Sequence, residues 1–146
     1  MNWLLDTNVV SELTRENPSA AVLAWLKERR GQCYLSAITL AELRYGVERL
    51  ANSRRKKELD QEFQFLMEDY QGRFFDVDGN VAAEWGRYAT ELEMHYGKGW
   101  YQQFDYRDTM LAATAREYGL GLATRNTRHF PFCPTVENPF GTQPPC

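Results

Sequence analysis

The sequence is poor in residues that build disulfide frameworks or zinc sites. It has three cysteines, Cys33, Cys133 and Cys146, without paired spacing, and two histidines. An odd number of cysteines without such spacing excludes a disulfide-stapled scaffold and is typical of a protein from a reducing cytoplasm. We expect Cys33 to be a small buried hydrophobic residue and Cys146 to be free.

The sequence also lacks an excess of positive charge and long apolar runs. It has 17 basic and 20 acidic residues, for a net charge of −3. This balance excludes a strongly basic nucleic-acid binder but not a local basic patch. No segment approaches the roughly 18 apolar residues that span a membrane, and the N-terminus shows no signal peptide. We expect a cytoplasmic protein with no membrane partner.

The 146 residues suit one domain, and hydrophobic residues make up 43% of them. Residues 1–140 are expected to form that domain, and the proline-rich residues 141–146 to fray. Short apolar runs alternate with longer helical patterns, which indicates an α/β fold with a mainly parallel sheet. The expected strands are Trp3-Leu4-Leu5, Cys33-Tyr34-Leu35, Phe74-Phe75, Leu122-Ala123-Thr124 and a short one at Val136.

Local signals predict where the helices begin. Pro18 suits the first turn of the second helix. Ser36 or Thr39 can cap the next one, and Asp78 can cap another after the third strand. A helix rich in small residues is expected from Asp105 to Tyr118, and its alanines predict close packing against its neighbours.

Four polar residues stand where strands meet the following helices, at Asp6, Glu42, Asp108 and Asn126. Each has an ordinary structural alternative. Asp6 can be a helix N-cap, Glu42 can close a capping box that begins at Thr39, and Asn126 is a common turn residue. Asp105 and Asp108 can both stabilise a helix N-terminus through the helix dipole.

In a parallel sheet these junctions lie at one edge, so the carboxylates of Asp6, Glu42 and Asp108 are expected to converge. Such a cluster needs a neutralising charge, and Mg²⁺ or Mn²⁺ with oxygen ligands provides it. Carboxylate-bound divalent ions serve phosphodiester hydrolysis, because they lower the pKa of a bound water and shield charge on phosphate. No cluster of histidines and cysteines offers a competing zinc site.

Four segments carry a family resemblance. In this order and spacing, they resemble the PIN-domain ribonucleases of VapBC-type toxin–antitoxin pairs and their FitB-like relatives. The similarity runs from Met1 to about Phe140. The segments are Leu4-Leu5-Asp6-Thr7-Asn8-Val9, Ser36-Ala37-Ile38-Thr39-Leu40-Ala41-Glu42-Leu43, Asp108-Thr109-Met110-Leu111-Ala112-Ala113-Thr114-Ala115 and Ala123-Thr124-Arg125-Asn126-Thr127-Arg128-His129-Phe130.

The resemblance implies a three-layer α/β/α sandwich around about five strands, and a Mg²⁺- or Mn²⁺-dependent endoribonuclease. Its metal ligands match Asp6, Glu42 and Asp108, and Asn126 stands where many members carry a fourth acid. It also implies an RNA substrate, a homodimer and a VapB-like antitoxin that inhibits the enzyme. The two proteins can form a hetero-oligomer that binds DNA through the antitoxin.

Other residues near these junctions are candidate substrate contacts. Thr7 and Thr124 can position water or a carboxylate, and Arg125 and Arg128 flank the expected site. Arg125 can instead balance Asp108. The basic run 54–57 is expected to be a solvated helix face.

Aromatic residues cluster beside the glycine-containing segment 97–99. We hypothesise that they help select the substrate by stacking on bases, although aromatics in such a place are more often core or dimer contacts. The cluster consists of Trp100, Tyr101, Phe104 and Tyr106.

Two other function classes fit parts of the pattern. A phosphatase of the haloacid-dehalogenase type also places an aspartate after its first strand, but it needs a second aspartate where this chain has Asn8. A catalytically silent PIN-fold module that binds nucleic acid or protein is the alternative to an enzyme. The presence of all three acids favours the enzyme.

Overall fold

A parallel sheet organises the chain. The computed structural model describes residues 1–141, and its strands are ordered β3-β2-β1-β4-β5 with every neighbouring pair parallel. The α/β fold and its five strands are therefore confirmed. The strands are β1 (Trp3–Leu5), β2 (Cys33–Ser36), β3 (Phe74–Phe75), β4 (Gly121–Ala123) and β5 (Val136–Glu137).

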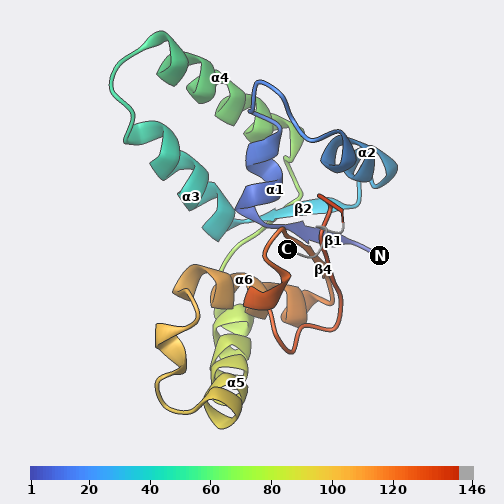
Figure 1. Cartoon of the computed structure of the whole chain (residues 1–146), viewed down its shortest axis with the longest axis vertical. Coiled ribbons are helices and arrows are strands. Elements are labelled where there is room, and N and C mark those ends of the chain that lie inside the picture. Colours follow the sequence, from blue (N-terminus) through green and yellow to red (C-terminus); the bar gives the residue numbers. More distant parts are fainter. Residues whose placement is uncertain (142–146) are drawn as a thin grey trace.

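Helices cover both faces of this sheet, which makes three layers (Figure 1). The helices are α1 (Thr7–Glu12), α2 (Ala20–Glu28), α3 (Ala37–Glu48), α4 (Arg54–Asp69), α5 (Gly79–Tyr96) and α6 (Tyr106–Tyr118), with short 3₁₀ turns η1 (Trp100–Gln102) and η2 (Thr127–His129). Helices α1 to α4 lie on one side, and α5 and α6 lie on the other.

The central strand β1 has a buried core on each side, because alternate side chains point to opposite faces. Trp3 and Leu5 pack with Val9 and Val22 on the α1–α4 side. Leu4 packs on the opposite side with buried residues of α5 and α6. Cys33 lies in the first of these cores and is buried, as expected.

Helix α6 approaches the sheet closely, as its alanines predicted. Ala112, Ala113 and Ala115 are all buried. Gly119 ends the helix in the left-handed conformation (φ 63°), which glycine adopts without strain. A Cβ on Gly121, at the start of β4, would lie 2.5 Å from two ring atoms of Trp3. This position requires glycine because the indole occupies the space.

Several helix starts differ from the sequence prediction. Pro18 does not lie in the first turn of α2, because Ser19 is the N-cap and the helix begins at Ala20. Ser36 caps α3, and Thr39 is buried inside that helix, where it donates to the backbone oxygen of Leu5 (3.4 Å). Asp105 caps α6 rather than beginning it, and β4 ends one residue before Thr124.

The division into a domain of residues 1–140 and a frayed tail stays a prediction, and positions 142–146, with Cys146, lie outside the described residues. No helix within residues 1–141 combines the length and the apolar content required to cross a membrane.

Candidate functional site

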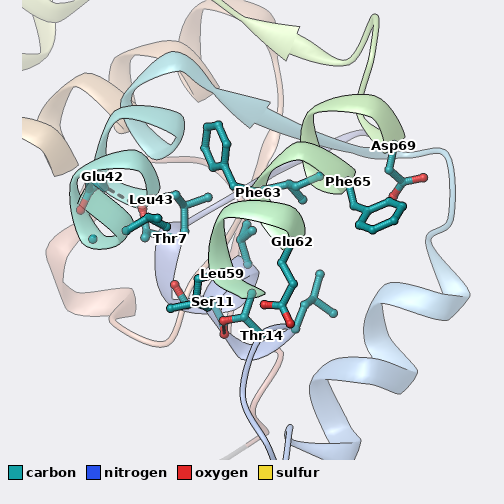
Figure 2. Close-up of a pocket in the computed structure, with 15 residues that line it drawn as sticks. Thr7, Ser11, Thr14, Glu42, Leu43, Leu59, Glu62, Phe63, Phe65 and Asp69 are labelled. Carbon is teal, nitrogen blue, oxygen red and sulfur yellow. Dashed lines mark hydrogen bonds between the residues drawn. The ribbon is translucent and has the colours of Figure 1, made fainter. Parts of the chain in front are cut away.

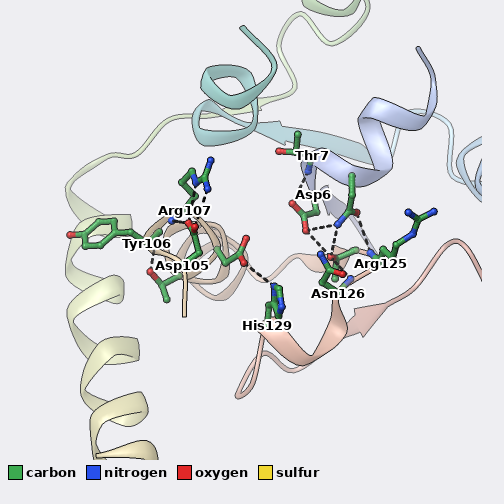
Figure 3. A network of polar contacts seen from close by, with 12 residues as sticks. Asp6, Thr7, Asp105, Tyr106, Arg107, Arg125, Asn126 and His129 are labelled. Carbon is green, nitrogen blue, oxygen red and sulfur yellow. Dashed lines mark hydrogen bonds and ion pairs between the residues drawn. The ribbon is translucent and has the colours of Figure 1, made fainter. Parts of the chain in front are cut away.

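Asp6 lies at the carboxyl end of β1, in the middle of the sheet. Its side chain is buried (6% exposed), although it is a carboxylate. One oxygen, Oδ1, accepts from the backbone N–H of Thr7 (2.7 Å), so Asp6 is the N-cap of α1. The other, Oδ2, accepts from Thr124 Oγ1 (2.6 Å) and from Asn8 Nδ2 (3.2 Å) (Figure 3). Burial raises the pKa of Asp6, and these donors oppose the rise.

Glu42 extends from α3 toward the same edge of the sheet. Its Oε1 accepts from Thr7 Oγ1 (3.1 Å), and its Oε2 lies 3.6 Å from Nη1 of Arg107. The capping-box alternative is wrong, because Ser36 caps this helix and Thr39 lies within it. Burial raises the pKa of Glu42, and the negative charge of Asp6 contributes in the same direction.

Asp108 lies in the first turn of α6, where its Oδ2 contacts Nδ1 of His129 (3.1 Å). Burial raises its pKa from 3.8 to about 6, and the charge of Asp6 is the second cause. The carboxylates of Asp6 and Asp108 are therefore close enough to repel each other. Raised pKa values in acids from different elements, caused by burial and by a neighbouring charge, are typical of functional sites.

The segment after β4 completes the edge. The hydroxyl oxygen of Thr124 accepts from the backbone N–H of Asn126 (3.0 Å). The side-chain oxygen of Asn8 accepts from the backbone N–H of Arg125 (3.1 Å). Asn126 thereby lies beside Asp6 (Figure 3), which is where sequence reasoning placed it.

Three residues at this edge were missed by sequence reasoning. His129, interpreted as a surface residue, contacts Asp108, and Asn8 links Asp6 to the segment after β4. Arg107 binds both Asp105 and Glu42, which belong to different helices. The sequence signal for this contact was that Arg107 lies between two candidate acids, Asp105 and Asp108, along the chain.

The arginines predicted to contact substrate behave differently from each other. The guanidinium of Arg125 lies 3.7 Å from the ring centroid of Phe140 and does not balance Asp108. Arg128 is exposed on η2. The basic run forms the first turn of α4, where Arg54 pairs with Glu58, as expected for a solvated helix face.

The aromatic cluster divides into two pairs. Trp100 and Phe104 are partly buried against the core on the α5–α6 side, so they are core contacts. Tyr101 and Tyr106 are exposed.

The chemistry of the acids fits a hard divalent cation, although their present arrangement does not form a complete coordination shell. The pKa values of all three buried or half-buried carboxylates are raised, so their charged forms are disfavoured. A bound cation would stabilise the charged form of each. Within residues 1–141, however, no three potential ligands among His, Cys, Asp and Glu are grouped closely enough to hold an ion. Mg²⁺ tolerates this situation because it commonly keeps several waters and binds one or two carboxylates.

A groove opens beside the acids, between α1, α3 and α4 (Figure 2). Its volume is about 640 Å³, and its lining is mainly apolar, with Leu43, Phe63 and Leu66 among the lining residues. Glu42 and Thr7 line it too, so the groove adjoins the acidic site. Glu62 also lines the groove, and its buried Oε2 has no hydrogen-bond partner among the described residues.

Comparisons with known proteins agree with this fold. The PIN domain family model matches residues 3–132. Toxin FitB of Neisseria gonorrhoeae is 40% identical over 87% of this chain and 89% of its own. VapC ribonuclease Y4jK of Sinorhizobium fredii is 34% identical over 87% of this chain and 89% of its own. The structure of FitAB bound to an IR36 DNA fragment superimposes with a TM-score of 0.84 at 35% identity, covering 97% of both chains.

The chain belongs to the PIN-domain family, in the group of the FitB and VapC toxins. The resemblance and the sandwich fold predicted from the sequence are thereby confirmed.

Proposed function

We propose that this protein is an Mg²⁺- or Mn²⁺-dependent endoribonuclease, the toxin of a toxin–antitoxin pair. The observation that carries the proposal is that the charge of Asp6, at the carboxyl end of β1, raises the pKa of both Glu42 on α3 and Asp108 on α6, although the three acids do not form a complete ion site as they stand. Burying like charges together is unfavourable for folding, so such a group suggests a function. Relatives named as ribonucleases support RNA as the substrate.

The three carboxylates would hold the ion, and Asn126 would orient a water or contact the outer hydration shell of the ion. When bound, the ion supplies a water of lowered pKa and shields charge on the phosphate. Thr124 and Thr7 donate to Asp6 and Glu42 respectively, which fixes these carboxylates in position. Asn in place of a fourth acid leaves the site with one negative charge fewer.

We further propose that an antitoxin inhibits the enzyme by occupying the groove beside Glu42. Toxin–antitoxin complexes occur among the structural neighbours, and three of them are bound to DNA. The groove is apolar but includes Glu42, Glu62 and Asp69, so it suits an apolar segment that carries a basic residue. A basic side chain at Glu42 would compete with the ion. The toxin is proposed to act as a homodimer, and the pair to bind DNA through the antitoxin.

Purified, antitoxin-free protein incubated with total RNA and Mg²⁺ tests the enzyme. We expect discrete cuts that disappear with EDTA and with Asp6→Asn. Asp76→Asn is the matched control, because Asp76 also follows a strand of this sheet but is exposed. Activity equal in Asp6→Asn and Asp76→Asn would contradict the proposed site. A folded protein that cuts no RNA with either ion would favour a silent binding module.

For the antitoxin, the expected result is a weaker apparent affinity for Mg²⁺ in the complex, measured by calorimetry. An unchanged Mg²⁺ affinity in an inhibited complex would contradict competition at Glu42.

A further inference from the structure

Tyr106 is exposed on α6, directed away from Asp6 (Figure 3), and its ring is supported by a neighbouring aromatic residue. Its side chain lies on helix α6, two residues before Asp108, and the residue is 61% exposed. Its ring packs on that of Trp85, with centroids 5.0 Å apart and planes tilted by 31°. Trp85 is anchored in turn, because its Nε1 donates to Oγ1 of the fully buried Thr109 (3.0 Å). The tyrosine is thus a supported aromatic surface that faces solvent.

Arg107, the next residue, presents a cation that is also held in place. Its Nε lies 3.0 Å from Oδ1 of Asp105, and its Nη2 lies 2.9 Å from Oδ2. Nη1 approaches Glu42, and the side chain remains 57% exposed. A guanidinium has five N–H donors, so these contacts leave it able to bind a phosphate oxygen. Asp105, whose role the sequence left open, is a positioning residue for Arg107.

We propose that the Tyr106–Trp85 pair and Arg107 form a subsite for one nucleotide of single-stranded RNA, with the base stacked on Tyr106 and a phosphate bound by Arg107. The inference rests on the proposed function, because it requires RNA at the acids. Tyr106 points away from Asp6 and His129, and Arg107 lies between Tyr106 and Glu42, so the base would stack beside the acidic site and its phosphate would lie on the side toward it (Figure 3). An aromatic ring for the base and a cation for the phosphate are the two elements of single-strand recognition.

A core contact, which is common for aromatics in such a place, fits Tyr106 less well. Trp100 and Phe104 are partly buried in the core, but Tyr106 is not. A dimer contact is the other alternative, so the test below measures oligomeric state together with RNA binding.

The test measures binding without cleavage, in an Asp6→Asn background with EDTA. The probe is a fluorescein-labelled single-stranded RNA of mixed sequence, and its anisotropy gives the dissociation constant. Tyr106→Ala should raise this constant on the order of tenfold, since a stacked base contributes about 1–3 kcal/mol. Tyr106→Phe should bind as the parent does. Tyr45→Ala is the matched control, because Tyr45 is 66% exposed on α3 and should show no effect.

Two further measurements separate the contribution of base stacking to RNA affinity from the contribution of the phosphate contact. The parent should bind an abasic version of the probe more weakly than it binds the intact probe. The affinity of Tyr106→Ala for the abasic probe should equal that of the parent for the same probe. Arg107→Gln should lower the slope of log affinity against log salt by about 0.7, the value for one phosphate contact on a single strand. Tyr106→Ala should leave that slope unchanged.

Equal binding by Tyr106→Ala and Tyr45→Ala would overturn the subsite, as would a parent that binds no RNA. Loss of the dimer in Tyr106→Ala with unchanged RNA affinity would instead assign Tyr106 to a protein interface. The outcomes also separate the two proposals. Cleavage by the unmodified protein without Tyr106-dependent binding refutes the subsite alone. Tyr106-dependent binding without cleavage under Mg²⁺ or Mn²⁺ refutes the nuclease alone.

Discussion

Asp108→Asn should stabilise the metal-free protein at neutral pH. The rise of the Asp108 pKa from 3.8 to about 6 corresponds to about 3 kcal/mol, at about 1.36 kcal/mol per pKa unit. The side chain of Asp108 is 21% exposed, so solvent screens its charge and reduces this value. Part of the rise also comes from the charge of Asp6. We expect the variant to exceed the wild type in free energy of unfolding by about 1–2 kcal/mol above pH 7.

The pH dependence follows from the direction of the change. The folded state holds a proton on Asp108 that the unfolded chain has released, between about pH 4 and pH 6. The wild type therefore loses stability as the pH rises through this window. Asp108→Asn resembles the neutral form and escapes that loss, so the difference between the proteins vanishes below about pH 4.

Urea denaturation in EDTA, at pH values from 4 to 8, measures the effect. Asp105→Asn is a control of opposite sign, because Arg107 lowers the pKa of Asp105 and its charged form stabilises the fold. Mg²⁺ should stabilise the wild type by about 2.7 kcal/mol at a hundredfold excess over its dissociation constant, and it should stabilise Asp108→Asn less. A variant that is no more stable than the wild type at pH 8 in EDTA would refute the electrostatic reasoning.

Three other substitutions test the packing around the site. Gly121→Ala should destabilise the protein by about 1–3 kcal/mol in denaturation, because the new Cβ would clash with Trp3. Thr124→Val should cost about 1.5–3 kcal/mol at neutral pH and raise the pKa of Asp6, because it removes the hydroxyl that donates to that carboxylate. Leu4→Ala should cost about 2–5 kcal/mol, since Leu4 is fully buried in the central strand. For each variant, a change in the free energy of unfolding below about 0.5 kcal/mol would contradict the contact on which its prediction rests.

The fold was predictable because its signals are local. Trp3–Leu5 and Gly121–Ala123 are short apolar runs, and the helices between the strands show clear periodicity. The strand ends placed Asp6 at one edge of a parallel sheet, and Asn126 follows β4 to the same edge. Helix starts were predicted less well, because Ser19 and Pro18 offer competing signals that only the packed structure resolves.

Contacts among residues distant in sequence were not predictable. The contact of His129 with Asp108 depends on how the segment after β4 turns, and no period in the sequence reports that turn. Arg125 was placed at the site by its position, but its side chain stacks on Phe140, whose location depends on the last strand. Surface side chains choose among several partners of similar energy, so their sequence position does not fix their contacts.

The same contacts explain how the protein folds with one buried and two half-buried acids before any ion binds. Thr124 donates to Asp6, Arg107 approaches Glu42, and His129 contacts Asp108, so each carboxylate has a separate donor from another part of the chain. These donors reduce the cost of burying the charges but do not abolish it, because the pKa values of all three acids stay raised, mainly by burial. A bound cation would reduce this remaining cost of burial and repulsion, which favours ion binding over an empty site.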